Sequence, residues 1–348
     1  MLQYKAPNNN VAPTGFMISG ISFQCANLGA GVYIEQPRRA AIEHLSIDHS
    51  ATPGSGYNGA SGGFSLVQLT STAAAYNEIR DISVAYAATD SFSDTLIDNG
   101  VREDFYSLNP GRDHYVISGS CKYSKPHLAN GGRYGFTVTI GNSSVYIDAA
   151  DAEGSTTLPP KSWIYIEANA GGLPLFVSNS YVGNSPSSGV AQGDGSIIQS
   201  ESTTNTINAV FSNCTFIANA NTAGWVYLPS NISGSIQIGN SIFEGSVTGT
   251  PITGTSALRI FGCKGFNPQG FAATTPAVPA SGTAVANPNP YPVRLLILTA
   301  TGATATYTDP SGTVSPSVAL TAGQWVTLDP GESITPTYTT LTWKPYGV

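Results

Sequence analysis

The segment VFSNCTFIAN, residues 210–219, alternates apolar with small or polar residues and is interrupted in its middle by an asparagine. The same order of residue types returns as LFVSNSYVGN at 175–184 and as IQIGNSIFEG at 236–245. An alternation of period two predicts short strands, and a central asparagine predicts a bend, because its side chain tolerates the left-handed backbone region. Three unequally spaced copies indicate one structural unit that is repeated along the chain.

The underlying pattern is a small or turn-forming residue followed by an apolar, any, apolar triplet. Its leading residues stand at 20, 44, 81, 120, 144, 179, 213, 240 and 262, and the shortest steps between them are 22 to 24 residues. A step of this length suits one coil of a parallel β-helix with three short strands, in which inward apolar positions stack from coil to coil. Longer steps are interpreted as coils with an inserted loop. The sequence therefore predicts an all-β protein that begins with a right-handed, single-stranded parallel β-helix.

The composition of the chain changes after this pattern ends, which predicts three parts. Residues 1–267 form the β-helix. Residues 268–292 are rich in Pro, Ala and Gly and are predicted to be a linker. In residues 293–348 strand-like runs alternate with the turn sequences DPSG, TAGQ and DPGE, which predicts a small antiparallel, β-sandwich-like C-terminal domain.

Charge and cysteine content exclude several classes of function. The net charge of −7 argues against nucleic acid as a partner, because phosphate binding needs clustered Lys and Arg. No apolar run reaches the ~18 residues of a membrane span, and the first 15 residues lack the apolar core of a secretory signal. We predict no metal site and no cofactor, because no Cys/His cluster with ligand spacing occurs. Four cysteines are spread along the chain and are expected to be small buried residues: Cys25, Cys121, Cys214 and Cys263.

Charged residues gather in residues 78–133, which hold 14 of the 35 in the chain. The central part, 89–120, falls in the longest step between coils and is predicted to be a loop on a rigid scaffold, a place that favours binding or catalysis. A glycosidase needs two carboxylates about 5–9.5 Å apart. The candidate catalytic residues are Asp90, Asp94, Glu103 and Asp104, and the candidate sugar-binding residues of this segment are Arg102, Tyr106, Arg112 and Tyr115. The alternative interpretation is a solvated loop held by salt bridges.

Two aromatic residues extend the candidate sugar site beyond this segment. Alternation places Trp163 and Tyr165 on one side of their strand and Ile164 and Ile166 on the other. Isoleucine is the stronger interior residue, so we expect Trp163 and Tyr165 to face outward, as a platform for sugars or a contact between subunits.

Two parts of the chain resemble virus tailspike and tail-fibre proteins built on the pectate-lyase-like β-helix superfamily. One is the irregular coil pattern that includes GISFQCANLGAGVYIE and AIEHLSID near the start, and the other is the C-terminal module NPNPYPVRLLIL…VTLDPGESITPTYTTLTWKPYG. Such proteins are typically homotrimers that attach to host-surface polysaccharide, and some of them cleave it. The resemblance implies a virion or extracellular location, a homotrimer, and contacts of the N-terminus with other virion tail proteins.

Three functional hypotheses stay open at this point. The first is a tailspike or tail fibre that attaches to a host-surface polysaccharide, with or without depolymerase activity. The alternative is a purely structural virion or extracellular fibre protein without glycan chemistry. The third is a free polysaccharide lyase or hydrolase, against which the absence of a secretory signal in these residues counts. The polygalacturonase signatures NTD, DD, GHG and RIK do not occur, so no catalytic motif assigns an enzyme.

Overall fold

The computed structural model describes most of the chain as strands and tight turns. The described residues are 2–4, 15–24, 31–35, 37–49, 62–67, 76–139, 144–154, 160–167, 174–183, 195–200, 206–218, 222–229, 233–249, 252–253, 258–263, 276–289 and 292–347. They divide into two compact units, Met1–Gly254 and Thr255–Val348. A search of the described residues for a helix long and apolar enough to cross a membrane finds none.

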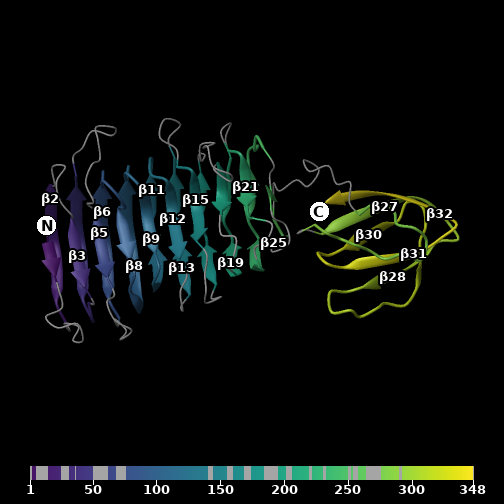
Figure 1. Cartoon of the computed structure of the whole chain (residues 1–348), viewed down its shortest axis with the longest axis horizontal. Helices are drawn as coiled ribbons and strands as arrows, with labels where there is room; N and C mark the ends of the chain where they lie inside the picture. Colours follow the sequence, from purple (N-terminus) through teal and green to yellow (C-terminus); the bar gives the residue numbers. More distant parts are fainter. Residues whose placement is uncertain are drawn as a thin grey trace. The chain divides into compact units, whose positions relative to one another are not determined.

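One face of the first unit is a 10-stranded sheet in which each strand pairs in parallel with the strand of the next coil (Figure 1). Its strands, in spatial order, are β1 (Leu2–Tyr4), β3 (Val32–Glu35), β5 (Phe64–Val67), β7 (Phe92–Asp94), β9 (Asp113–Ile117), β12 (Tyr134–Thr139), β15 (Ser162–Glu167), β18 (Ser196–Gln199), β21 (Gly224–Tyr227) and β24 (Ile252–Thr253).

The other two faces belong to a single 15-stranded sheet that bends along its length. In the first coils one long strand spans both faces, and in later coils it is divided into two short strands. The long strands are β2 (Met17–Gln24), β4 (Ala41–Asp48), β6 (Glu78–Ala85) and β8 (Ile97–Leu108). The short pairs are β10 (Ser120–Ser124) with β11 (His127–Ala129), β13 (Val145–Asp148) with β14 (Asp151–Glu153), β16 (Leu175–Ser178) with β17 (Tyr181–Gly183), β19 (Thr206–Ser212) with β20 (Thr215–Ile217), and β22 (Ser233–Gly239) with β23 (Ile242–Glu244), followed by β25 (Leu258–Phe261). The predicted parallel β-helix is thereby confirmed.

A column of left-handed residues marks the bend between these two faces. The strand register aligns Gly20 with His44, and continues through Asp81 in the next coil. The complete aligned column is Gly20, His44, Asp81, Asp104, Lys125, Ala149, Asn179, Asn213 and Asn240, all with φ between 49° and 71°. The sequence pattern located six of these positions. It placed the bend of two coils wrongly, at 120 and 144 instead of at Lys125 and Ala149, because apolar alternation also occurs in the strand before the bend.

The expected loop at 89–120 is likewise wrong, because this segment holds β7, β8 and β9 and adds a complete coil. The register places Asp94 between Leu66 and Ile117 in one inward column. It places Arg102 in another inward column, beside Ile79. Because polar residues occupy inward positions here, the sequence lacks the apolar alternation that marks a strand. This is why the segment was predicted to be a loop.

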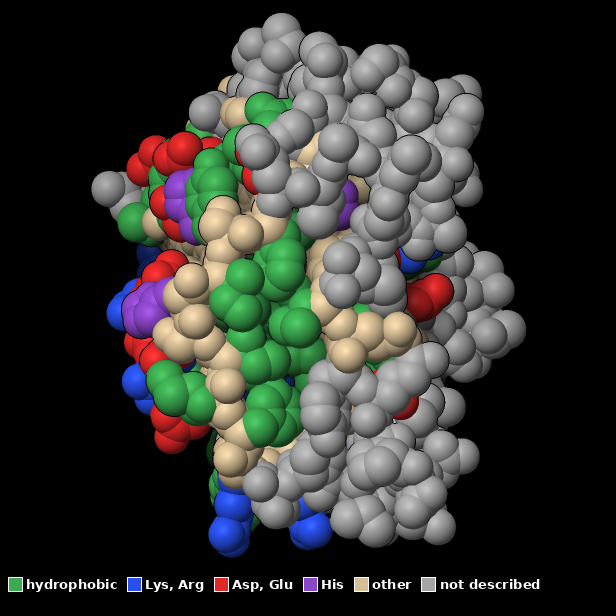
Figure 2. Space-filling view, turned by 90° about the vertical axis from the view of Figure 1, so that its left-hand side faces the viewer, with side chains coloured by type: hydrophobic (Ala, Val, Ile, Leu, Met, Phe, Trp, Pro, Cys, Tyr) green, Lys and Arg blue, Asp and Glu red, His purple; other side chains and the backbone are tan. Residues whose placement is uncertain are grey.

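Aromatic stacking fills the interior of these middle coils. Phe92 stacks on Tyr115 with ring centroids 4.8 Å apart, and Tyr115 stacks on Phe136 at 5.0 Å. Phe64 joins the row at 6.3 Å from Phe92. Figure 2 looks onto the end of the unit that carries its first strands, where apolar side chains gather in the middle and charged side chains lie around the margin, most of them on the left. The core therefore runs along the inside of the coils.

The C-terminal unit consists of two antiparallel sheets, as the sandwich-like prediction requires. The first contains β26 (Val285–Ala286), β31 (Ser333–Thr337), β28 (Thr304–Thr308) and β29 (Val318–Ala319), and the second contains β30 (Trp325–Leu328), β27 (Val293–Thr301) and β32 (Thr340–Gly347). Residues 276–289, inside the segment predicted as a linker, pack on this unit: β26 pairs with β31, and the indole N–H of Trp343 donates to the carbonyl of Pro276 at 2.8 Å.

Candidate functional site

A groove of about 270 Å³ lies on the outer surface of the 10-stranded sheet, across β9, β12 and β15. The register aligns Val116, Thr137 and Tyr165 in adjacent coils, so their side chains emerge side by side. Successive residues of a strand point to opposite faces, and these three alternate with the buried residues of the core. The full lining is Arg112, Asp113, Val116, Arg133, Tyr134, Thr137, Tyr165 and Glu167.

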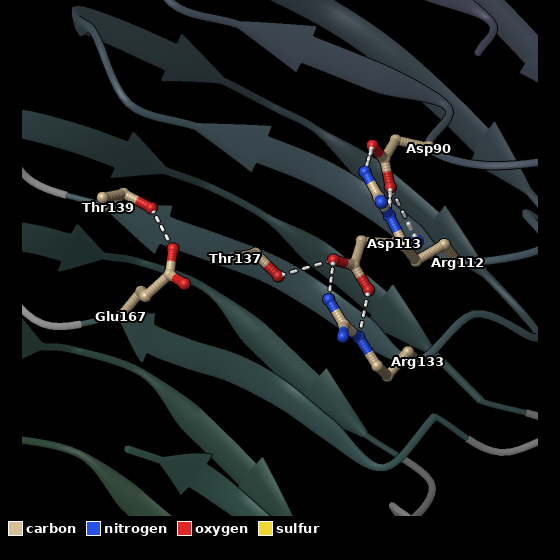
Figure 3. Close-up of polar contacts among 7 residues, drawn as sticks. All are labelled: Asp90, Arg112, Asp113, Arg133, Thr137, Thr139 and Glu167. Atoms are coloured by element: carbon tan, nitrogen blue, oxygen red, sulfur yellow. Dashed lines mark hydrogen bonds and ion pairs between the residues drawn. The ribbon is translucent and has the colours of Figure 1, made fainter. Parts of the chain in front are cut away.

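Two arginine–carboxylate pairs form the polar part of the groove (Figure 3). Arg112 donates through Nε to Oδ1 of Asp90 at 2.7 Å and through Nη2 to Oδ2 of the same carboxylate. Arg133 donates through Nε and Nη2 to the two oxygens of Asp113, at 3.1 and 2.9 Å. The hydroxyl of Thr137 adds a bond to Asp113 at 3.0 Å. Two-point pairing of this kind fixes the plane of each guanidinium group.

Burial differs sharply between the two halves of each pair. The carboxylates of Asp90 and Asp113 are buried, whereas 53% of the Arg112 side chain and 45% of the Arg133 side chain are exposed. The hydrogen bonds that Arg112 donates to Asp90 and Arg133 donates to Asp113 raise the pKa of each arginine, so both stay cationic. The buried carboxylates therefore act as anchors, and the guanidinium groups are the parts that face solvent.

Aromatic rings continue the groove on the side of Arg133. The guanidinium carbon lies 4.7 Å from the ring centroid of Tyr134, and the rings of Tyr134 and Tyr165 are parallel at 4.2 Å. One face of Tyr165 is thus covered by Tyr134. The exposed carboxylate of Glu167 stands at the end of β15 and accepts a hydrogen bond from the hydroxyl of Thr139 at 2.5 Å.

Among the residues predicted from the sequence, Arg112 and Tyr165 line this groove, and the buried carboxylate of Asp90 anchors Arg112. Asp94 and Arg102 lie inside the coils and pair with each other at 2.9 Å, with 3% and 0% of their side chains exposed. Tyr115 is also buried, and its hydroxyl donates to the carbonyl of Phe105 at 2.9 Å. These three residues are part of the core and do not reach the surface.

The expectation that Trp163 faces outward is wrong, because its side chain is completely buried. Ile164, its neighbour, is buried as well, so strict alternation fails at the start of β15. The adjacent coil carries Gly135 at the aligned position, where a Cβ atom would lie 2.7 Å from Cε3 of Trp163. The missing side chain at Gly135 provides the space that the indole ring occupies.

The remaining candidates lie on β8, away from the groove. Glu103 and Asp104 are at the bend, where Nζ of Lys125 is 3.3 Å from the first and 3.8 Å from the second carboxylate. The ring of Tyr106 packs on that of His127 at 5.0 Å. Burial raises the pKa of Tyr106. The four predicted catalytic carboxylates are therefore divided among the groove, the core and the bend, and form no single site.

Sequence reasoning missed five polar or aromatic lining residues, although a short repeat marks two of them. GRDHY at 111–115 and GRYGF at 132–136 share a Gly-Arg pair with an aromatic residue three positions after the arginine, at a spacing of one coil. The backbone N–H of Arg133 bonds the carbonyl of Arg112, which aligns the two arginines. The missed residues are Asp113, Arg133, Tyr134, Thr137 and Glu167.

No family model matches the chain, and no curated protein matches it. Among solved structures, pectate lyase Pel9A is similar over 78% of this chain and 75% of its own, with 16% identity and a TM-score of 0.41. The enzymatically active domain of tailspike protein 4 from bacteriophage CBA120 is similar over 95% of this chain and 62% of its own, with 13% identity and a TM-score of 0.32. The residues of the groove, rather than these similarities, are the basis for the function proposed below.

Proposed function

We propose that the β-helix is a glycan-binding module and that its groove attaches the protein to a cell-surface polysaccharide. The observation that carries this proposal is one groove in which the stacked rings of Tyr134 and Tyr165 lie beside the anchored guanidinium groups of Arg112 and Arg133. A sugar ring presents apolar C–H groups on its faces and hydroxyls around its rim, so it needs an aromatic face next to fixed polar groups. The groove supplies both on strands of a rigid sheet, which is where a precise site is best supported.

The groove favours attachment over hydrolysis. Glycoside hydrolysis uses one carboxylic acid to protonate the leaving group and a second carboxylate as base or nucleophile. Both oxygens of Asp90 and Asp113 already accept bonds from guanidinium groups, which leaves Glu167 as the exposed carboxylate of the lining. A depolymerase activity would need a partner for Glu167, and an assay for new reducing ends or unsaturated products tests for it.

The finer part of the proposal is a virion tailspike or tail-fibre protein that binds its host through this groove. It follows the sequence resemblance described above, which also implies a homotrimer and contacts of the N-terminus with other tail proteins. Light scattering at micromolar concentration tests the trimer, and a monomer would count against the tailspike assignment. The alternative, a structural fibre protein without glycan chemistry, predicts that no polysaccharide binds.

The binding experiment compares the wild-type chain with Tyr165→Ala on an array of bacterial surface polysaccharides. Loss of one stacking face should weaken binding about tenfold, corresponding to about 1–1.5 kcal/mol. The matched control is Tyr146→Ala, because Tyr146 is also an exposed, stacked aromatic residue, 4.8 Å from Phe176 on the 15-stranded sheet. Equal losses in both variants, or binding unaffected by Tyr165→Ala, would place the sugar site elsewhere.

A further inference from the structure

The charges around the groove are balanced and largely satisfied by one another. Arg112 and Arg133 are each paired with a buried carboxylate, and the lining adds the exposed Glu167. Lys161 precedes β15 in line with Arg133, to whose carbonyl its backbone N–H donates at 2.7 Å. Even when Lys161 is counted, three cationic residues stand against the carboxylates of Asp90, Asp113 and Glu167, so the site carries no net positive charge to attract an anion.

The arginines are also unable to offer their usual carboxylate-binding edge. A guanidinium group recognises a carboxylate best through two parallel N–H donors. In both arginines the edge formed by Nε and Nη2 is already occupied, by Asp90 for Arg112 and by Asp113 for Arg133 (Figure 3). The donors that remain are those of Nη1 and the second N–H of Nη2; their charge is already balanced by the paired carboxylate, and they suit the hydroxyls of a sugar.

From this arrangement we infer that the groove selects polysaccharides without negative charge and discriminates against uronic acids and other acidic sugars. The inference rests on the proposed function and names the class of glycan that this site takes. A carboxylate on the ligand would meet two arginines whose charges are already balanced by Asp90 and Asp113, and it would lie in the field of Glu167. We expect each negative charge on the ligand to weaken binding about three- to tenfold at low salt.

The first test uses one panel of bacterial capsular polysaccharides, each in its native acidic form and after chemical reduction of its carboxyl groups. Tighter binding of the reduced form supports the inference, and the preference should shrink at about 1 M salt, where charges are screened within about 3 Å. Tightest binding to an acidic form, with loss after reduction, overturns the inference and leaves the proposed function intact. Binding to neither form, nor to neutral polysaccharides, overturns the proposed function and the inference with it.

The second test changes the charge of the groove alone. Glu167→Gln should raise the ratio of acidic-form to neutral-form affinity about three- to tenfold, because one like charge is removed. The control is Glu153→Gln, which makes the same charge change at an exposed glutamate of β14 on the 15-stranded sheet, and should leave that ratio unchanged. An unchanged ratio in Glu167→Gln, or an equal rise in both variants, contradicts the assignment of the selectivity to this groove.

Discussion

Asp94 and Arg102 form an ion pair inside the β-helix, and a double-mutant cycle on them provides a sharp test of the fold. Asp94 accepts three hydrogen bonds, from Nε of Arg102 at 2.9 Å, from the hydroxyl of Tyr123 at 2.9 Å and from the backbone N–H of Leu96 at 3.0 Å. Both charged side chains are almost completely buried. Each single replacement, Asp94→Leu or Arg102→Met, leaves one charge buried without its counter-charge.

The expected magnitudes follow from this geometry. Asp94→Leu should lower the free energy of unfolding by about 3–5 kcal/mol, because the arginine charge remains in the core. Arg102→Met should cost about 2–4 kcal/mol, since Asp94 keeps the bonds from Tyr123 and Leu96. The double variant continues the apolar columns of Leu66, Ile117 and Ile79. Its stability should therefore lie within about 2 kcal/mol of the wild type.

Equilibrium unfolding in urea, followed by circular dichroism at neutral pH, measures all three variants. The control is Arg80→Met, which breaks a 2.8 Å pair with Glu78 on the surface, where the side chains are 50% and 67% exposed. It should cost less than about 1 kcal/mol. Two results would refute the placement of this pair in the core. One is a double variant whose free energy of unfolding is as low as that of the less stable single variant. The other is an Asp94→Leu variant whose free energy of unfolding lies within about 1 kcal/mol of the control.

Three further predictions address the packing beside the groove and the bends. Gly135→Ala should destabilise the protein by about 2–3 kcal/mol in the same urea assay, because its Cβ would lie 2.5 Å from the carbonyl oxygen of Trp163; an unchanged midpoint would contradict the close packing. Burial lowers the pKa of His114 to about 4, so the unfolded chain binds the extra proton between pH 6.5 and 4. Stability should fall by about 3 kcal/mol as the pH drops through that window, and His114→Gln should flatten the profile; equal slopes in both proteins would refute this account. Ala149→Gly, at a φ of 54°, should raise stability by about 1 kcal/mol, whereas the same change at the strand residue Ala209 should lower it; a loss at both sites would argue against strain at the bend.

Wherever apolar residues mark the inward positions, the sequence was sufficient to predict the fold. In the segments around Asn179, Asn213 and Asn240 the alternation and the bend residue occur together, and the register confirms that they stack. The reason is local: a two-residue period and a residue that tolerates φ near 50° are properties of the strand and the bend themselves.

The same reasoning failed in the coil of residues 89–120, where the inward positions hold charged residues. Nothing near Arg102 in the sequence shows that Asp94 lies opposite to it, since the two residues come from different faces of the coil. The pairing of Asp113 with Arg133 is a contact between adjacent coils, 20 residues apart in the chain. Local sequence could not distinguish these partners from solvated surface charges.

Stacked coils and a bend at a column of left-handed residues follow from the chain alone, because backbone preference and alternation are encoded residue by residue. Which polar residues are buried, and which meet in the groove, depends on contacts between coils that no local pattern encodes. Tyr165 is half-buried at the surface and Trp163 is completely buried, because a glycine stands beside the indole ring in the neighbouring coil. The residues that become neighbours in adjacent coils are set by the number of residues in each coil. Adding or removing one residue in a coil would shift the strand register and exchange these neighbours.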